Sequence, residues 1–341
     1  IAAAIAIAMN AAGWLPLVAT TPTTAVVTIK SRTKGTTGNG WLLAYEYTGT
    51  GLTLTVVPQA SGATDPDIQD ALDAALPAQF DLIAVDRSVG TDIDDVIDHL
   101  ETVSGPMEQR PGTAYFGYVG SVATAVTLAN GRNSGRVVMP YMRGTRTHPI
   151  ELAAAMAAAV AAEDDRARPL NGIELKVGVS PDDLADRLTR TEQESCLANG
   201  VCCLEVGGQD KVKIVRSVTT YYQNDAGNSD DTLLDVQTIR VLDYVRYAVR
   251  YKVQEQLGRV KLASVAVTPN TTDPAKARTL ILGVLLQLQN DLGYLERVEE
   301  WGDRLIVERD SQVATRLNAV IPADIVDGLH VFAGEIQLII G

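Results

Sequence analysis

Residues 80–103 (FDLIAVDRSVGTDIDDVIDHLETV) contain the pattern that decides the fold. Their first six residues form a short, nearly continuous apolar run, as expected of a strand that is buried on both faces. From residue 92 onward, apolar side chains recur at helical spacing, at Ile93, Val96, Ile97 and Leu100. The stretch therefore predicts a buried strand followed by an amphipathic helix.

The same alternation continues on both sides of this stretch. Helices are expected over residues 66–76, 122–130 and 149–162, and strands over residues 113–119 and 136–139. Strands and helices that alternate at this spacing are typical of βαβ units with a mainly parallel sheet. We therefore predict a layered α/β domain over residues 61–170.

Residues 1–60 predict a small α+β segment of a different character. An alanine-rich helix is expected over residues 1–12, and alternating apolar and polar residues predict strands over residues 25–32, 41–47 and 52–58. The chain starts inside this helix and without Met, so we expect it to belong to a longer protein with a preceding N-terminal part.

Residues 171–341 predict a C-terminal α+β domain. Its helices are expected over residues 181–198, 231–257 and 274–292, the second capped by Ser229 or Asp230, with a β-hairpin over residues 201–218. Residues 331–341 (VFAGEIQLIIG) are a strand-like apolar segment, which needs a partner strand in its own sheet or on another molecule. The predicted fold is thus mixed α/β.

Composition and charge argue against several classes of function. The net charge of −13 disfavours nucleic acid as a direct partner, because phosphate binding needs clustered lysines and arginines. No apolar run reaches the roughly 18 residues of a membrane span, so membrane insertion is not expected. Cys196, Cys202 and Cys203 lie far in sequence from the histidines, which favours buried thiols over a metal site.

No catalytic, cofactor-binding or metal-ligating residue is predicted. Four acidic residues could suggest a cation site, but they occupy the first turns of a predicted helix, where carboxylates favour the helix dipole. These residues are Asp92, Asp94, Asp95 and Asp98. The glycine-rich residues 35–40 and 117–120 lack the order of a phosphate-binding loop, and no Gly-x-Ser-x-Gly motif is present.

The polar run at residues 216–230 (RSVTTYYQNDAGNSD) leads into the longest predicted helix. Together with Leu234-Asp235-Val236, it resembles the signature of tail sheath proteins of Mu-like contractile-tailed bacteriophages. Further similar motifs follow in order between about residues 20 and 260: residues 28–39, 65–68, 153–170 (with Arg166 in place of a proline) and 189–200.

The resemblance implies a structural subunit and not an enzyme, with no cofactor. Sheath subunits form hexameric rings, stacked as a helix around a rigid tail tube, and contract to drive the tube through the host envelope. The implied partners are other copies of the chain, the tail tube protein, and the baseplate and tail terminator proteins. The implied location is the virion, after assembly in the host cytoplasm.

In such sheaths, terminal arms donate β-strands to neighbouring subunits. The resemblance therefore implies that residues 331–341 are an exchanged arm, because this segment is apolar and strand-like. The residues expected to dock into a neighbour are Val331, Phe332, Ile336, Leu338 and Ile340.

Two alternatives stay open. A cytoplasmic α/β enzyme with an unrecognised acidic or metal site would also fit the layered domain and the acidic helix start. A sheath from a phage-derived, tailocin-like particle would share the same sequence features as a phage sheath.

Overall fold

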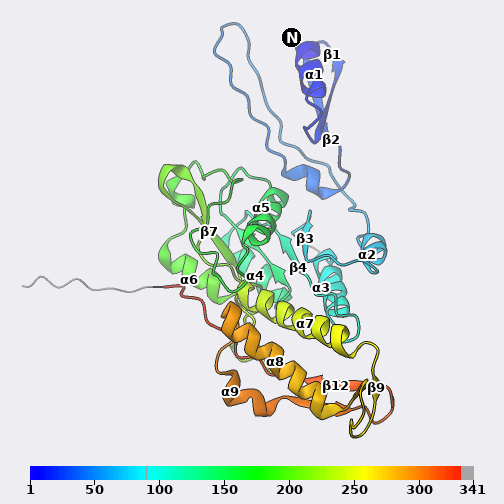
Figure 1. Ribbon diagram of the computed structural model, residues 1–341. Helices are drawn as coiled ribbons and strands as arrows, with labels where there is room; N and C mark the ends of the chain where they lie inside the picture. The colour runs from blue at the N-terminus through cyan, green and yellow to red at the C-terminus, as the bar shows by residue number, and fades with distance from the viewer. Residues whose placement is uncertain (89–90, 332–341) are drawn as a thin grey trace, which may run out of the picture.

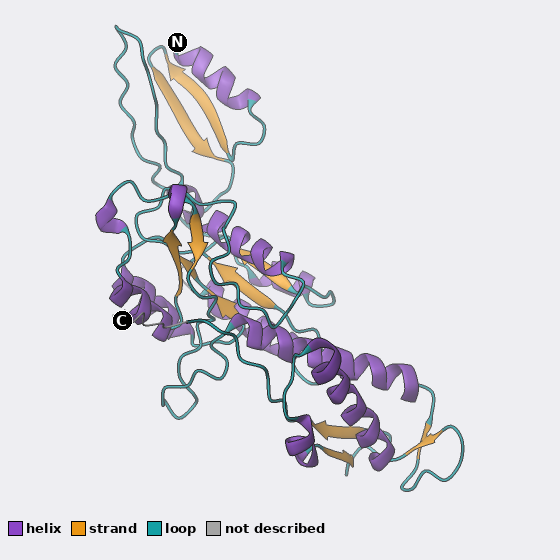
Figure 2. Ribbon diagram, turned by 60° about the vertical axis from the view of Figure 1, so that its left-hand side comes forward, coloured by secondary structure: helices purple, strands orange, loops and turns teal. Residues whose placement is uncertain are grey.

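The computed structural model describes residues 1–88 and 91–331. The chain forms an elongated molecule in which an N-terminal unit, a central layered unit and a C-terminal unit follow one another (Figures 1 and 2). Helices and short sheets occur together in this arrangement, which confirms the predicted mixed α/β fold.

The central unit is built on two three-stranded sheets, with strand orders β3-β4-β5 and β6-β7-β8. Neighbouring strands pair in parallel, except that β7 and β8 form an antiparallel hairpin. Only Met139 separates β5 from β6, so the two sheets continue each other as one layer. The strands are β3 (Leu82–Val85), β4 (Thr113–Phe116), β5 (Val137–Val138), β6 (Pro140–Tyr141), β7 (Cys202–Val206) and β8 (Val212–Ile214).

Helices cover both faces of this layer. The helices are α2 (Gln69–Ala75), α3 (Asp92–Val103), α4 (Val122–Arg132), α5 (Pro149–Ala162) and α6 (Arg190–Ala198). Successive side chains of β4 enter different cores: Ala114 and Phe116 pack with α3 and α4, whereas Tyr115 packs with α5. Burial on both faces explains why these strands are almost uniformly apolar, as the sequence predicts.

The N-terminal unit contains α1 (Ala2–Ala11), antiparallel strands β1 (Leu17–Thr23) and β2 (Val26–Ser31), and the 3₁₀ helix η1 (Thr36–Gly40). Residues 41–60 form a long extended excursion beside it (Figure 1). The strands predicted over residues 41–47 and 52–58 are wrong, because no β-ladder forms there within the described chain. The outgoing and returning parts of this excursion are linked instead by a hydrogen bond that the hydroxyl of Tyr45 donates to the carbonyl oxygen of Leu54.

The C-terminal unit is a helical layer with two small sheets. Its helices are α7 (Val236–Leu257), α8 (Pro274–Leu292) and α9 (Val298–Trp301), and its strands are β9 (Lys261–Leu262), β10 (Thr271–Thr272), β11 (Ile306–Arg309) and β12 (Leu317–Val320). Short 3₁₀ helices are η2 (Leu184–Asp186) and η3 (Gly208–Asp210) in the central unit and η4 (Gly302–Arg304) here. Its core gathers side chains from α7, α8 and α9, beginning with Val241.

The single helix predicted over residues 181–198 is wrong in its first half. The guanidinium of Arg143 donates hydrogen bonds to the carbonyl oxygens of Ala185 and Asp186, and this segment forms only the short 3₁₀ helix η2, not an α-helix. A capping box between Thr189 and Glu192 then starts α6.

The cap predicted for the longest helix is also wrong. Asp230 accepts hydrogen bonds from the Tyr221 hydroxyl and the Thr232 N–H, and so belongs to the preceding turn. Residues 232–234 form a further turn, Asp235 then forms a bridge with Val218, and Asp235 takes the N-cap position of α7.

Candidate functional site

Two of the four acidic residues at the start of α3, Asp92 and Asp94, form ion pairs with nearby arginines. Arg87 contacts Asp92 at 2.7 Å, and Arg132 contacts Asp94 at 3.2 Å. Across residues 1–88 and 91–331, no group of three or more His, Cys, Asp or Glu residues is placed to hold a metal ion. These carboxylates therefore act as helix-start and ion-pair groups.

The three cysteines are free thiols buried in the central unit. Burial raises the pKa of Cys202 to about 12, so this thiol stays protonated and poorly nucleophilic at neutral pH. His148 caps α5 and stacks on Trp41, with ring centroids 4.2 Å apart. The three cysteines and His148 thus have structural roles.

The signature stretch joins the central layer to the start of α7. Thr219 and Thr220 are fully buried, and their N–H groups donate to the carbonyl oxygens of Leu234 and Val137 at 2.7 and 2.8 Å. The Thr220 hydroxyl also donates to the carbonyl of Ser134 at 3.1 Å. Small hydroxyl side chains are needed here because they satisfy main-chain groups inside the core.

Arg216 and Asp235 form a second part of this junction. The guanidinium of Arg216 contacts both carboxylate oxygens of Asp235, at 2.8 and 2.6 Å. On the other side, His330 lies 3.5 Å from Asp235, 3.0 Å from the side-chain nitrogen of Gln237 and 3.3 Å from the side-chain oxygen of Asn171. We call this cluster the His330 seat.

The His330 seat lies directly before the expected arm. Asp235 belongs to the signature stretch, and Asn171 directly follows the motif at residues 153–170. Gly328 is so close to Pro169 of that motif that an added Cβ would lie 2.5 Å from its ring. Two of the motifs that carry the family resemblance therefore meet at the start of the C-terminal segment. Of the five docking residues, Val331 is exposed, whereas Phe332, Ile336, Leu338 and Ile340 lie outside the described residues.

The small sheet β11–β12 is a candidate assembly surface. The two strands pair in antiparallel register from Ile306↔Val320 to Arg309↔Leu317, and within the described chain no third strand joins them. Apolar side chains on it face solvent, with Ile306 52% and Val320 64% exposed. Unpaired strand edges of this kind can accept a further strand.

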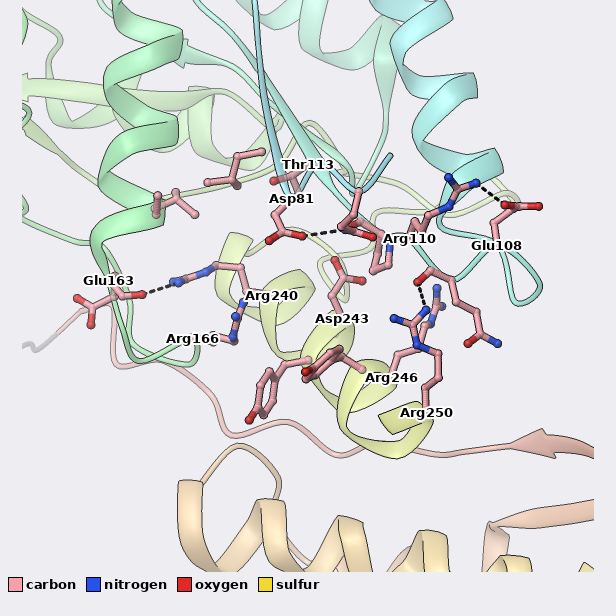
Figure 3. Close-up of a pocket in the computed structure, with 18 of the residues that line it drawn as sticks. Asp81, Glu108, Arg110, Thr113, Glu163, Arg166, Arg240, Asp243, Arg246 and Arg250 are labelled. Atoms are coloured by element: carbon pink, nitrogen blue, oxygen red, sulfur yellow. Dashed lines mark hydrogen bonds and ion pairs between the residues drawn. The ribbon is translucent and has the colours of Figure 1, made fainter. Parts of the chain in front are cut away.

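A polar cleft of about 920 Å³ lies beside α7 (Figure 3). We call it the arginine cleft, after its five arginines: Arg110, Arg166, Arg240, Arg246 and Arg250. Three of them come from α7 and share one side of that helix with Tyr244 and Tyr247. The opposite wall is formed by the loop before β4, the start of β3 and the end of α5.

Most of these guanidinium groups donate hydrogen bonds to main-chain carbonyl oxygens. Arg240 donates to the carbonyl of Glu163 and Arg250 to that of Gln109, each at 2.6 Å, and Arg246 donates to the carbonyl of Ser104. The guanidinium carbon of Arg166 lies 5.1 Å from the centroid of the Tyr244 ring. Within the described residues, Arg166, Arg240, Arg246 and Arg250 form no ion pair.

The carboxylates of the cleft are mostly engaged. Asp243 pairs with Arg136 at 2.5 Å, Glu108 pairs with Arg110, and Glu163 pairs with Arg168 at 3.3 Å. Burial raises the pKa of Asp243 despite this pairing, whereas burial and the nearby Arg166 lower the pKa of Arg240. Five carboxylates line the cleft alongside its five arginines, but two of them are paired with arginines from outside it, Arg136 and Arg168.

The comparisons with known proteins agree with one another. Residues 61–220 match the family described as "Phage tail sheath protein central domain", and residues 228–339 match the "Phage tail sheath C-terminal domain". The chain is 28% identical over 338 residues to the Mu-like prophage FluMu tail sheath protein of Haemophilus influenzae, covering 96% of this chain and 68% of that protein.

Solved structures share the fold. The sheath tail protein of Listeria innocua has a TM-score of 0.55 at 12% identity, covering 90% of this chain and 68% of that one. The helical sheath of the anti-feeding prophage in its contracted state has a TM-score of 0.51 at 14% identity, covering 79% and 72%.

The fold, the matched families and the solved neighbours define a structural protein of a phage tail. The chain belongs to the phage tail sheath family, and so is a virion component and not an enzyme. No helix among the described residues is both long and apolar enough to cross a membrane.

Proposed function

We propose that this chain is the repeating subunit of a contractile tail sheath, which assembles with copies of itself as stacked hexameric rings. The match of both sheath domains over residues 61–220 and 228–339 carries this proposal. The fold it shares with a helical sheath in the contracted state supports contraction in particular. Contraction would drive the tail tube through the host envelope after assembly in the host cytoplasm.

The remaining partners follow from this role. The sheath surrounds the tail tube protein, starts from the baseplate and ends at the tail terminator. A solved neighbour of the same fold comes from the anti-feeding prophage baseplate, with a TM-score of 0.51 and 12% identity, which supports a baseplate contact.

The chain acts in three parts, residues 1–60, 61–170 and 171–341, with residues 331–341 as an arm. The arm adds its strand to a free edge of the β11–β12 sheet of a neighbouring subunit. Two observations support this choice: the sheet has solvent-facing apolar residues, and the His330 seat fixes the point from which the arm leaves. Strand addition relies on main-chain hydrogen bonds, so it can keep subunits connected while their other contacts change.

Proline substitutions on β11 and β12 test the acceptor edge. The N–H of Asp310 donates to the carbonyl of Arg316, and bonded and unbonded pairs alternate along an antiparallel ladder. The N–H groups of Val307 and Ala319 therefore point away from the ladder, toward the two free edges. Val307→Pro or Ala319→Pro should block strand addition without breaking the β11–β12 pairing.

The readout is tube formation of the purified protein, observed by negative-stain electron microscopy. We expect hollow tubes with six-fold end views from the wild type, and folded monomers from a chain lacking residues 331–341 and from at least one proline variant. Tubes of wild-type abundance from all three altered chains would contradict the strand-exchange mechanism.

A further inference from the structure

The arginine cleft contains more arginines than carboxylates among its groups without an ion pair. Four guanidinium groups without an ion pair line it, against two lining carboxylates, Asp81 and Asp164, that likewise form none within the described residues. In the view of Figure 3, Arg166 and Arg240 lie on one side of Asp243, and Arg246 and Arg250 lie on the other. The positive groups thus spread along the whole cleft.

One of these guanidinium groups is incompletely satisfied. The Nη1 atom of Arg240 is buried, and no described residue accepts a hydrogen bond from it. A buried donor without an acceptor is costly, more so when it carries charge. Because burial and Arg166 already lower the pKa of Arg240, an anion placed between these two arginines would stabilise both.

Exposed tyrosines extend the cleft along α7. Tyr247 and Tyr251 are 51% and 58% exposed, and their rings stack with centroids 6.1 Å apart. Tyrosine and arginine are the residues that contribute most often to the energetic centre of protein interfaces. Planar guanidinium groups also suit the bidentate recognition of carboxylates. The cleft therefore has the composition of a protein-binding surface for a carboxylate-bearing segment.

We infer that the arginine cleft binds an acidic surface segment of a second copy of this chain. A second copy fits because the chain carries a net charge of −13, so its outer surface is rich in carboxylates, while four arginines of this cleft have no ion pair within the described residues. A contact between two different surfaces of identical chains is heterologous, and such contacts build rings or open helical assemblies. The inference rests on the proposed sheath function, in which identical copies border one another.

Charge reversal at two exposed arginines of the cleft tests this contact. Arg166 and Arg250 reach the cleft from different elements, and the R166E/R250E double variant makes it acidic. The R190E/R259E variant is a control for net charge, because it changes the charge equally at two exposed arginines outside the cleft, of which Arg190 pairs with Glu194. R166K/R250K keeps the charge but removes the planar guanidinium groups, and circular dichroism checks that every variant is folded.

Tube assembly in graded salt gives the first readout. We expect R166E/R250E to need about tenfold more protein than the wild type for tube formation, or to form none, while R190E/R259E assembles as the wild type does. Assembly of the wild type should weaken as salt screens the contact. Equal assembly of R166E/R250E and wild type would overturn the inference and leave the sheath function standing.

Peptide binding by the monomer gives a second readout that does not depend on tubes. A hexaglutamate peptide, followed by calorimetry, should bind wild type and the R190E/R259E control, and should bind R166E/R250E at least about tenfold more weakly. No difference between these proteins would contradict a carboxylate-binding cleft. Wild-type protein that never forms tubes would instead count against the sheath function, so the two failures are distinguishable.

Discussion

Single residues at the His330 seat connect the signature motif with the C-terminal segment. Burial raises the pKa of Asp235, but hydrogen bonds from His330 and Arg216 outweigh this effect and hold it below its ordinary value. The carboxylate therefore stabilises the fold when it is ionised. This contribution is present above the pKa of the unfolded state, about 3.9, and is lost as the pH falls through the lower folded-state pKa.

We predict that Asp235→Asn lowers the free energy of unfolding by about 1–3 kcal/mol at pH 7, because Arg216 and His330 lose a charged acceptor. The difference from wild type should shrink as the pH falls toward 3 and below. Chemical denaturation at pH 7 and at low pH measures both effects. Asp225→Asn, on an exposed turn, is the control, and a difference that stays constant with pH would contradict the linkage.

At the scale of elements, α7 has three neighbours. Its first turn meets the signature stretch, its middle lines the arginine cleft, and its buried side packs on α8 through Val241 and Val245. Arginines and tyrosines recur along residues 240–251 (RVLDYVRYAVRY), and this spacing is the signal for the cleft in the sequence. It does not indicate which segments form the opposite wall of the cleft.

Packing between α7 and α8 should dominate the stability of the C-terminal unit. Leu285 on α8 is fully buried in that core. We predict that Leu285→Ala costs about 2–5 kcal/mol in the free energy of unfolding, because it removes apolar contacts and leaves a cavity. Leu292→Ala, at a position 46% exposed, is the matched control. Equal losses for both variants in urea denaturation would contradict this packing.

At the scale of the whole molecule, some segments pack into shared cores and others make few contacts. Both central cores contain side chains from either side of residue 170, and the C-terminal core begins at Val241. The domain boundary predicted near residue 170 concerns which parts of the chain act together in the sheath, and it stays a prediction. The excursion at residues 41–60, by contrast, is held by few contacts within the described chain.

We predict that chymotrypsin cuts this excursion first, at Tyr45 or Tyr47, which are 54% and 44% exposed. Extended, poorly bonded segments enter a protease site more readily than packed ones. Mass spectrometry of a time course should show a stable fragment that keeps the central and C-terminal units together. An earlier cut inside the central layer would contradict the rigidity of that layer.

The sequence by itself determined the layered unit, most of the helices and the family. Apolar periodicity predicts α3, because burial on one side of a helix leaves a regular pattern along the chain, and the helices expected over residues 149–162 and 274–292 correspond to α5 and α8. The ordered motifs predict a tail sheath protein, which the family matches confirm.

Only the tertiary structure decided the rest. Residues 41–58 alternate like strands, but a strand needs a partner in register, which local sequence cannot supply. Arg143 breaks the helix predicted over residues 181–198 by bonding carbonyl groups more than 40 positions away. The His330 seat and the arginine cleft likewise join segments distant in sequence. Long-range hydrogen bonds and charges, and not local periodicity, therefore define the candidate sites.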